Sequence, residues 1–165
     1  MSLAELDETT QYLTFKLQDE VFAFDISKVR EVLDFTTITK VPRTPEFMRG
    51  VINLRGSVVP VVDLRLKFGM EEMSYTERTC IIVAEMQGMS GSIQMGIVVD
   101  SVSEVLNIKG VDVEGTPPFG AKLDTDYILG MAKMNGGVKI LLDIDKVLSA
   151  HGTGLVGEEG TINAQ

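Results

Sequence analysis

The feature that most constrains the fold is an internal repeat. Residues 50–69 read GVINLRGSVVPVVDLRLKFG, and residues 130–149 read GMAKMNGGVKILLDIDKVLS. Each copy has two glycines six positions apart, a β-branched run, an aspartate and a short amphipathic segment. Glycine suits tight turns and aspartate caps helical turns, so the repeat conserves structural positions. The corresponding residues, 80 positions apart, are Gly50, Gly56, Val58 and Asp63 in the first copy and Gly130, Gly136, Val138 and Asp143 in the second.

The repeat also extends upstream of these segments. VREVLD at 29–34 matches VSEVLN at 102–107, at an offset of 73 residues. The offset rises from 73 residues at 29–34 to 80 residues at 50–63, which implies about seven extra residues in a loop of the second copy near 117–122. Loops absorb such insertions at low cost. We expect a first repeat over about 12–70 and a second over about 79–150. Flexible ends are expected at 1–11 and 151–165.

Short apolar runs rich in β-formers dominate both copies, which predicts an all-β fold with short helical turns. A module of this size buries too little surface to be stable alone, so duplication is expected to supply a shared core. We expect one helical turn over 44–50. The strand that contains Pro60 should lie at a sheet edge or carry a bulge, because proline has no backbone N–H. The expected strands are 12–17, 21–26, 29–35, 51–54, 57–64, 79–86, 93–100, 102–108, 132–134 and 138–144.

Charge and cysteine content narrow the possible partners and location. The formal net charge is −9, and an acidic surface disfavours nucleic acid. A nucleic-acid-binding barrel therefore remains only a minor alternative. No apolar run approaches the roughly 20 residues that span a bilayer. The N-terminus lacks the features of a signal peptide, and Cys80 is the single cysteine, so a cytoplasmic location is expected.

Candidate catalytic residues are few. His151 is the only histidine, Cys80 lies in an apolar strand, and no metal-ligand spacing occurs. Asp63 and Asp143 occupy equivalent places, as in a two-lobed carboxylate hydrolase, but helix capping explains both. The expectation is a protein that is not an enzyme and that uses no metal and no cofactor.

Two charged residues stand out because they lie within apolar stretches. Glu31 lies in VREVLDF and Arg55 in VINLRG. Each is either a solvated residue on the outer side of a strand or a polar contact at a protein interface, where arginine is favoured for its bidentate geometry. Asn135 occupies the position of Arg55 in the second copy, so the two halves are not expected to be equivalent in binding.

Three segments carry a family resemblance: VFAFDISKVREVLDF, ITKVPRTPEFMRGVINLRGSVVPVVDLRLKFG and MGIVVDSVSEVL. With the block P-x-x-P-x-F-x-x-G-x-x-N-L-R-G-x-x-x-P-x-x-D-L at 42–64, the chain resembles the CheW family of bacterial chemotaxis coupling proteins over residues 12–150. The resemblance implies two five-stranded SH3-like β-barrels related by a pseudo-twofold axis. It also implies a non-catalytic adaptor, in cytoplasmic arrays at the membrane, between chemoreceptors and the histidine kinase CheA. A scaffold in a non-flagellar chemosensory pathway is the alternative.

The resemblance also implies site residues. The cytoplasmic hairpin tip of the receptor is expected in an apolar groove between the barrels, and the regulatory domain of CheA at a barrel end. The receptor-binding residues implied are Ile26, Val29, Glu31, Arg55, Val98 and Val99. The kinase-binding residues implied are Val41, Pro42, Phe47 and Met48.

Overall fold

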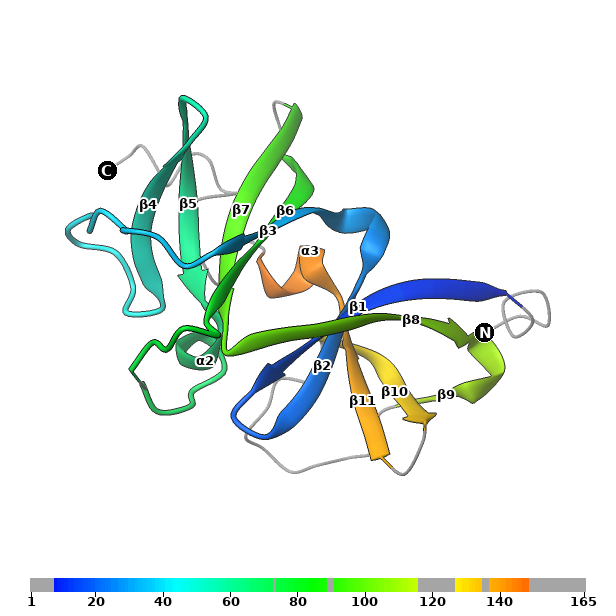
Figure 1. Cartoon of the computed structure of the whole chain (residues 1–165). Helices are drawn as coiled ribbons and strands as arrows, with labels where there is room; N and C mark the ends of the chain where they lie inside the picture. The colour runs from blue at the N-terminus through cyan, green and yellow to red at the C-terminus, as the bar shows by residue number, and fades with distance from the viewer. Residues whose placement is uncertain (1–7, 73, 89–90, 116–126, 135–136, 149–165) are drawn as a thin grey trace.

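The computed structural model describes residues 8–72, 74–88, 91–115, 127–134 and 137–148. These residues form two β-sheets that meet at a central junction, where the two short helices α2 and α3 also lie (Figure 1). The strand order is β8-β1-β2-β11-β10-β9 in the six-stranded sheet and β3-β6-β7-β5-β4 in the five-stranded sheet. The expected all-β class with short helical turns is confirmed.

Among the described residues, four short helical turns interrupt a series of short strands. The strands of the first half are β1 (Thr9–Leu17), β2 (Glu20–Asp25), β3 (Val29–Asp34), β4 (Met48–Leu54) and β5 (Ser57–Asp63). Those of the second half are β6 (Cys80–Gly88), β7 (Gly91–Val99), β8 (Ser101–Lys109), β9 (Val113–Glu114), β10 (Ile128–Met134) and β11 (Gly137–Leu142). The helical turns are η1 (Ile26–Lys28), α2 (Leu64–Lys67), η2 (Gly110–Asp112) and α3 (Ile144–Val147).

The two sheets do not follow the two halves of the sequence. Strands β1 and β2 join the sheet of β8 to β11, while β6 and β7 join the sheet of β3 to β5. The exchange is symmetric: Val61 of β5 pairs in parallel with Gly96 of β7, and Leu141 of β11 pairs in parallel with Ala23 of β2. Ala23 and Gly96 are 73 residues apart, and Val61 and Leu141 are 80 residues apart, which are the two offsets of the repeat. The repeat therefore relates the two sheets by a pseudo-twofold operation.

A glycine allows each sheet to close on itself. In the five-stranded sheet, Thr39 of the segment between β3 and β4 forms a β-bridge with Val51 of β4. In the six-stranded sheet, β9 pairs with β10 at the equivalent place. A Cβ on Gly50 would lie 2.0 Å from the carbonyl oxygen of Thr39, and one on Gly130 would lie 2.9 Å from that of Glu114. Both glycines also follow a register shift in their strand. They therefore permit a backbone approach that no other residue tolerates.

The largest core cluster is shared by both sheets. It combines Phe15 and Phe24 of the six-stranded sheet with Ile82 and Ile97 of the five-stranded sheet, all fully or almost fully buried. Smaller clusters lie within each sheet alone. The expected core shared by both copies is therefore present, and the instability of one unit alone stays a prediction. Helices α2 and α3 contribute to the shared cluster through Leu64, Ile144 and Val147.

Some boundaries differ from the sequence-based expectation. The helical turn predicted over 44–50 is a β-turn in which Met48 N donates to Pro45 O at 2.9 Å, and Met48 then begins β4 by pairing with Val62. Long-range pairing therefore overrides the local helical signal. β1 begins at Thr9 rather than at residue 12 because it pairs with Lys109 of β8. No helix among the described residues has the length and apolar character needed to cross a membrane.

At Pro60, β5 pairs with a neighbouring strand on one side only. β5 pairs with β4 along its whole length, but its pairing with β7 begins only at Val61. The expectation of an edge or bulged strand is wrong, because β5 lies between β7 and β4 and the register shift falls on β4. Pro60 is accommodated because it precedes the part of the strand that pairs on both sides.

Candidate functional site

The fold brings together Glu31 and Arg55, the two charged residues that the sequence singled out. Glu31 lies on β3, and Arg55 lies in the turn between β4 and β5. Arg55 Nη1 lies 3.4 Å from Glu31 Oε1, and Nη2 bonds the second carboxylate oxygen. The hydrogen bond to Glu31 raises the pKa of Arg55 above its usual range. The result is a bidentate ion pair on the surface.

The turn that carries Arg55 has an unusual backbone. Arg55 has φ of +50° and Gly56 has φ of +89°, so both central residues of this two-residue turn are left-handed. Such turns match the twist of the flanking strands and favour Asn-Gly sequences. An arginine in this conformation is costly, which is a mark of functional positions. Asn135 and Gly136, the equivalent pair in the second repeat, lie outside the described residues.

Ile26 and Val29 flank the crossing from one sheet to the other. Ile26 lies in η1, and both side chains are partly buried against the shared core. Val29 also lines a pocket of about 450 Å³ whose wall includes the Arg30–Glu85 ion pair, at 3.2 Å. Val29 therefore borders this hollow, and Ile26 does not line it; the receptor-binding role of both residues stays a prediction.

Val98 and Val99, expected on the receptor-facing surface, are instead core residues. Their exposed fractions are 3% and 1%, because β7 lies between β6 and β5 and both of its faces are covered. Neither side chain can contact a partner at the surface. The apolar residues that do remain exposed include equivalent pairs at the two offsets of the repeat: Val32 and Val105, and Val58 and Val138.

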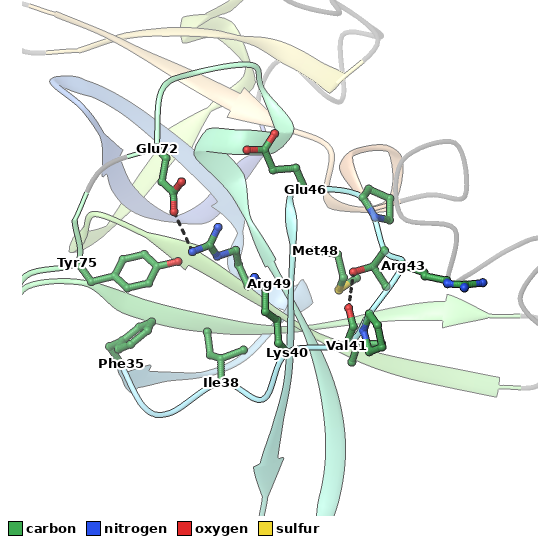
Figure 2. A pocket seen from close by; sticks show the side chains of 13 residues that line it. Phe35, Ile38, Lys40, Val41, Arg43, Glu46, Met48, Arg49, Glu72 and Tyr75 are labelled. Carbon is green, nitrogen blue, oxygen red and sulfur yellow. Dashed lines mark hydrogen bonds and ion pairs between the residues drawn. The ribbon is translucent and has the colours of Figure 1, made fainter.

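Three of the four expected kinase-binding residues lie together. Val41, Pro42 and Met48 line a pocket of about 950 Å³ beside β4 (Figure 2). Met48 contributes little surface because it is 5% exposed. Phe47 does not line this pocket, and Lys67 Nζ lies 4.5 Å from the centre of its ring.

The structural aspartates have the predicted capping roles. Asp63 Oδ1 accepts from Arg65 N at 3.0 Å, and Asp143 Oδ1 accepts from Lys146 N at 3.2 Å. The arrangement gives both carboxylates a structural task. Among the described residues, no group of three His, Cys, Asp or Glu is placed to hold a metal ion.

Sequence reasoning missed two ion pairs that hold the helical turns to the segments joining the sheets. Arg65 of α2 is 8% exposed, and its Nε lies 2.6 Å from Asp100 Oδ1. At the equivalent place in α3, Asp145 pairs with Lys28 at 2.9 Å, with the charges reversed. The repeat places residue 145 at the position of residue 65, but only the fold reveals their partners.

Tyr75 lies in the segment between α2 and β6 and attaches this segment to the five-stranded sheet. Its hydroxyl donates to Asp63 Oδ2 at 3.1 Å, and its ring packs on Phe35 with centroids 4.4 Å apart. Burial raises the pKa of Asp63 above its usual range. Burial, followed by the nearby Asp63 carboxylate, raises the pKa of Tyr75 to about 12.

The raised pKa of Tyr75 predicts an alkaline transition. Because the folded-state value lies above the unfolded value of 10, the stabilisation from the neutral phenol is present below pH 10 and is lost as the pH rises through about 12. An absorbance titration of tyrosine ionisation should show one phenol titrating near pH 12, and Tyr75→Phe should remove that step. A late step that survives in Tyr75→Phe would assign it to another tyrosine.

Comparison with known proteins places the chain in a family. The CheW-like domain matches residues 11–151. The chain is 39% identical over 146 residues to "Chemotaxis protein CheW" of Klebsiella aerogenes, with 88% of this chain and 86% of that protein covered. It is 34% identical over 152 residues to the protein of the same name in Thermotoga maritima, with 89% and 93% covered.

A solved structure agrees with these sequence relatives. The crystal structure of the scaffolding protein TtCheW from Thermoanaerobacter tengcongensis superimposes with a TM-score of 0.78 at 34% identity, covering 88% of this chain and 96% of that one. This similarity confirms the expected two-subdomain fold class. The chain therefore belongs to the CheW-like family and is a chemotaxis adaptor.

Proposed function

We propose that the protein couples chemoreceptors to the histidine kinase CheA without catalysing a reaction. The observation that carries the proposal is the surface ion pair between Glu31 and Arg55, which the fold assembles from residues 24 positions apart. An arginine held in a costly backbone conformation at an exposed turn has no evident role in the core. The cytoplasmic face of a membrane-bound receptor array is the expected location.

The receptor-binding surface in this proposal comprises Ile26, Val29, Glu31 and Arg55. The first two offer partly buried apolar contact, with Val29 beside a hollow, and the ion pair supplies a charged rim. Apolar anchors supply most of the affinity of such a surface, and rim charges select the partner. Val98 and Val99 are left out because they are buried.

The kinase-binding surface in this proposal is the loop that contains Val41 and Pro42. Val41 is 37% exposed, and Pro42 stiffens the loop, so little conformational entropy is lost on binding. This surface and the receptor-binding surface lie on different segments of the first half. An adaptor needs two such separate sites, so that both partners bind at once.

Two substitutions are each expected to weaken the binding of one partner only. Glu31→Lys places a cation beside Arg55 and should weaken binding of a receptor hairpin-tip fragment about tenfold or more, whereas Val41→Glu should weaken binding of the CheA regulatory domain. Fluorescence anisotropy with each labelled fragment measures both. Because Glu31 is a surface residue, its substitution should change the free energy of unfolding by less than about 0.5 kcal/mol.

Glu20→Lys is the matched control for Glu31→Lys, since it makes the same charge change at the exposed first residue of β2. It should leave both affinities unchanged. A large fall in melting temperature for Glu31→Lys would make Glu31 a structural residue. If the wild-type protein binds neither fragment, the proposal that it couples chemoreceptors to CheA is wrong.

A non-flagellar chemosensory pathway remains the second candidate. A relative named "Protein FrzA" from Myxococcus xanthus is 31% identical over 140 residues, so the similarity extends to a protein that does not carry the CheW name. Swarming assays of a deletion strain, set against a screen for other chemosensory outputs, distinguish the two pathways.

A further inference from the structure

A pocket lies outside the proposed receptor-binding surface, and its lining includes Val41 and Pro42 of the proposed kinase-binding loop. It occupies about 950 Å³ between the loop 35–46 and the connecting segment that carries Glu72 and Tyr75, and it is called here the loop pocket. Figure 2 shows Phe35, Ile38, Arg49 and Tyr75 gathered along one side of it. Pockets of this size commonly hold small organic ligands.

One wall of the loop pocket is aromatic and fixed in place. The rings of Phe35 and Tyr75 pack with centroids 4.4 Å apart and an interplanar angle of 41°. Tyr75 cannot swing away without breaking its hydrogen bond to the buried Asp63. The rings therefore offer a preformed surface on which a planar apolar group can pack.

A guanidinium adjoins this wall. Arg49 lies 5.8 Å from the centre of the Tyr75 ring, and its Nη2 donates to Glu72 Oε2 at 3.0 Å. The Arg49 side chain is 25% exposed, whereas that of Glu72 is 55% exposed. Glu72 is therefore the more solvated member of the pair. An incoming carboxylate can replace Glu72 at the guanidinium, which leaves the cation paired throughout.

The charge of the lining also favours an anion. In a chain of net charge −9, this pocket gathers more cations than acids. An anionic ligand is thus drawn to the loop pocket rather than to the rest of the surface. The charged lining residues are Lys40, Arg43, Arg49, Glu46 and Glu72.

We propose that the loop pocket binds a small aromatic carboxylate. Its ring packs against Phe35 and Tyr75, and its carboxylate takes the place of Glu72 at Arg49, with Lys40 as a second cation. Neither the family membership nor the adaptor role assigns a ligand to this pocket. The pocket shares Val41 and Pro42 with the proposed kinase-binding loop, so ligand binding is tested on the chain alone, with no CheA fragment present.

The test is a titration of the ¹⁵N-labelled full chain, followed by NMR. The probe is phenylacetate, with 2-phenylethanol and phenethylamine as neutral and cationic analogues of similar size. Phenylacetate should give saturable shifts at residues lining the loop pocket, with a dissociation constant of about 1 mM, as expected for a ligand of ten heavy atoms. The two analogues should bind at least about fivefold more weakly. Equal shifts from all three probes, or no saturable shift at the pocket, would overturn the proposal.

Lys40→Glu tests the role of charge without disturbing the core, because Lys40 is exposed. It should weaken phenylacetate binding at least about fivefold. Lys109→Glu makes the same charge change at an exposed position on β8 and should leave binding unchanged. Equal weakening by both variants would show a general effect of net charge, and no weakening by Lys40→Glu would show that the pocket cations do not hold the carboxylate. Either result rejects the site.

Discussion

Gly50→Ala should lower the free energy of unfolding by at least about 3 kcal/mol, or prevent folding altogether. Gly50 has φ of +143°, and an added Cβ would lie 2.0 Å from the carbonyl oxygen of Thr39 and 2.7 Å from its carbonyl carbon. The obstacle is backbone, so no side-chain rotation relieves it. The bridge between Thr39 and Val51, which closes the five-stranded sheet, must therefore open. Urea unfolding followed by circular dichroism measures the loss.

Gly56→Ala is the matched control. Gly56 also has a positive φ, of +89°, but no atom lies within 4 Å of the added Cβ. Only the left-handed backbone is penalised, which costs about 1–2 kcal/mol. Gly130→Ala should fall between the two, because its added Cβ meets a Val113 methyl at 2.5 Å and the Glu114 carbonyl oxygen at 2.9 Å. If Gly50→Ala costs no more than Gly56→Ala, close backbone approach is not the reason for glycine at this position.

Phe15→Ala should cost about 3–5 kcal/mol and should destabilise both sheets together. Phe15 is fully buried on β1 and contacts the rings of Phe22 and Phe24, at centroid distances of 6.0 and 4.8 Å. Its cluster also contains Ile82 and Ile97 from the other sheet. Because the sheets share this core, amide hydrogen exchange in both should lose protection by the same amount, as in a single cooperative unit.

Val58→Ala is the control for the loss of apolar volume, because Val58 is 71% exposed. It should change the free energy of unfolding by less than about 0.5 kcal/mol. A Phe15→Ala variant in which only the six-stranded sheet loses protection would contradict the shared core and would make the two sheets separate folding units.

Much of the fold follows from local patterns. Strands were expected in all the segments that pair as the hairpins β1 with β2, β4 with β5, β6 with β7, and β10 with β11, because each is a short apolar run rich in β-formers. The aspartate caps were predicted because capping depends on residues a few positions apart. The two family features, the repeat and the NLRG block, were also visible in the sequence.

The surface was harder to predict. Val98 and Val99 were expected to face a partner, but β7 is covered on both faces. An apolar strand looks the same in sequence whether it lines a groove or a core. The pairing of Glu31 with Arg55, and of Arg65 with Asp100, could not be read from spacing, because each joins residues brought together only by the sheets.

By itself, the sequence determined that the chain is duplicated, all-β, poor in catalytic residues and related to the CheW family. These properties depend on composition, short-range periodicity and fixed offsets, which the order of residues contains directly. Only the tertiary structure decided which half supplies each strand of a sheet, which apolar residues are buried and which charges meet. Such choices depend on contacts between segments far apart in the chain, where burial of a shared core outweighs local preference.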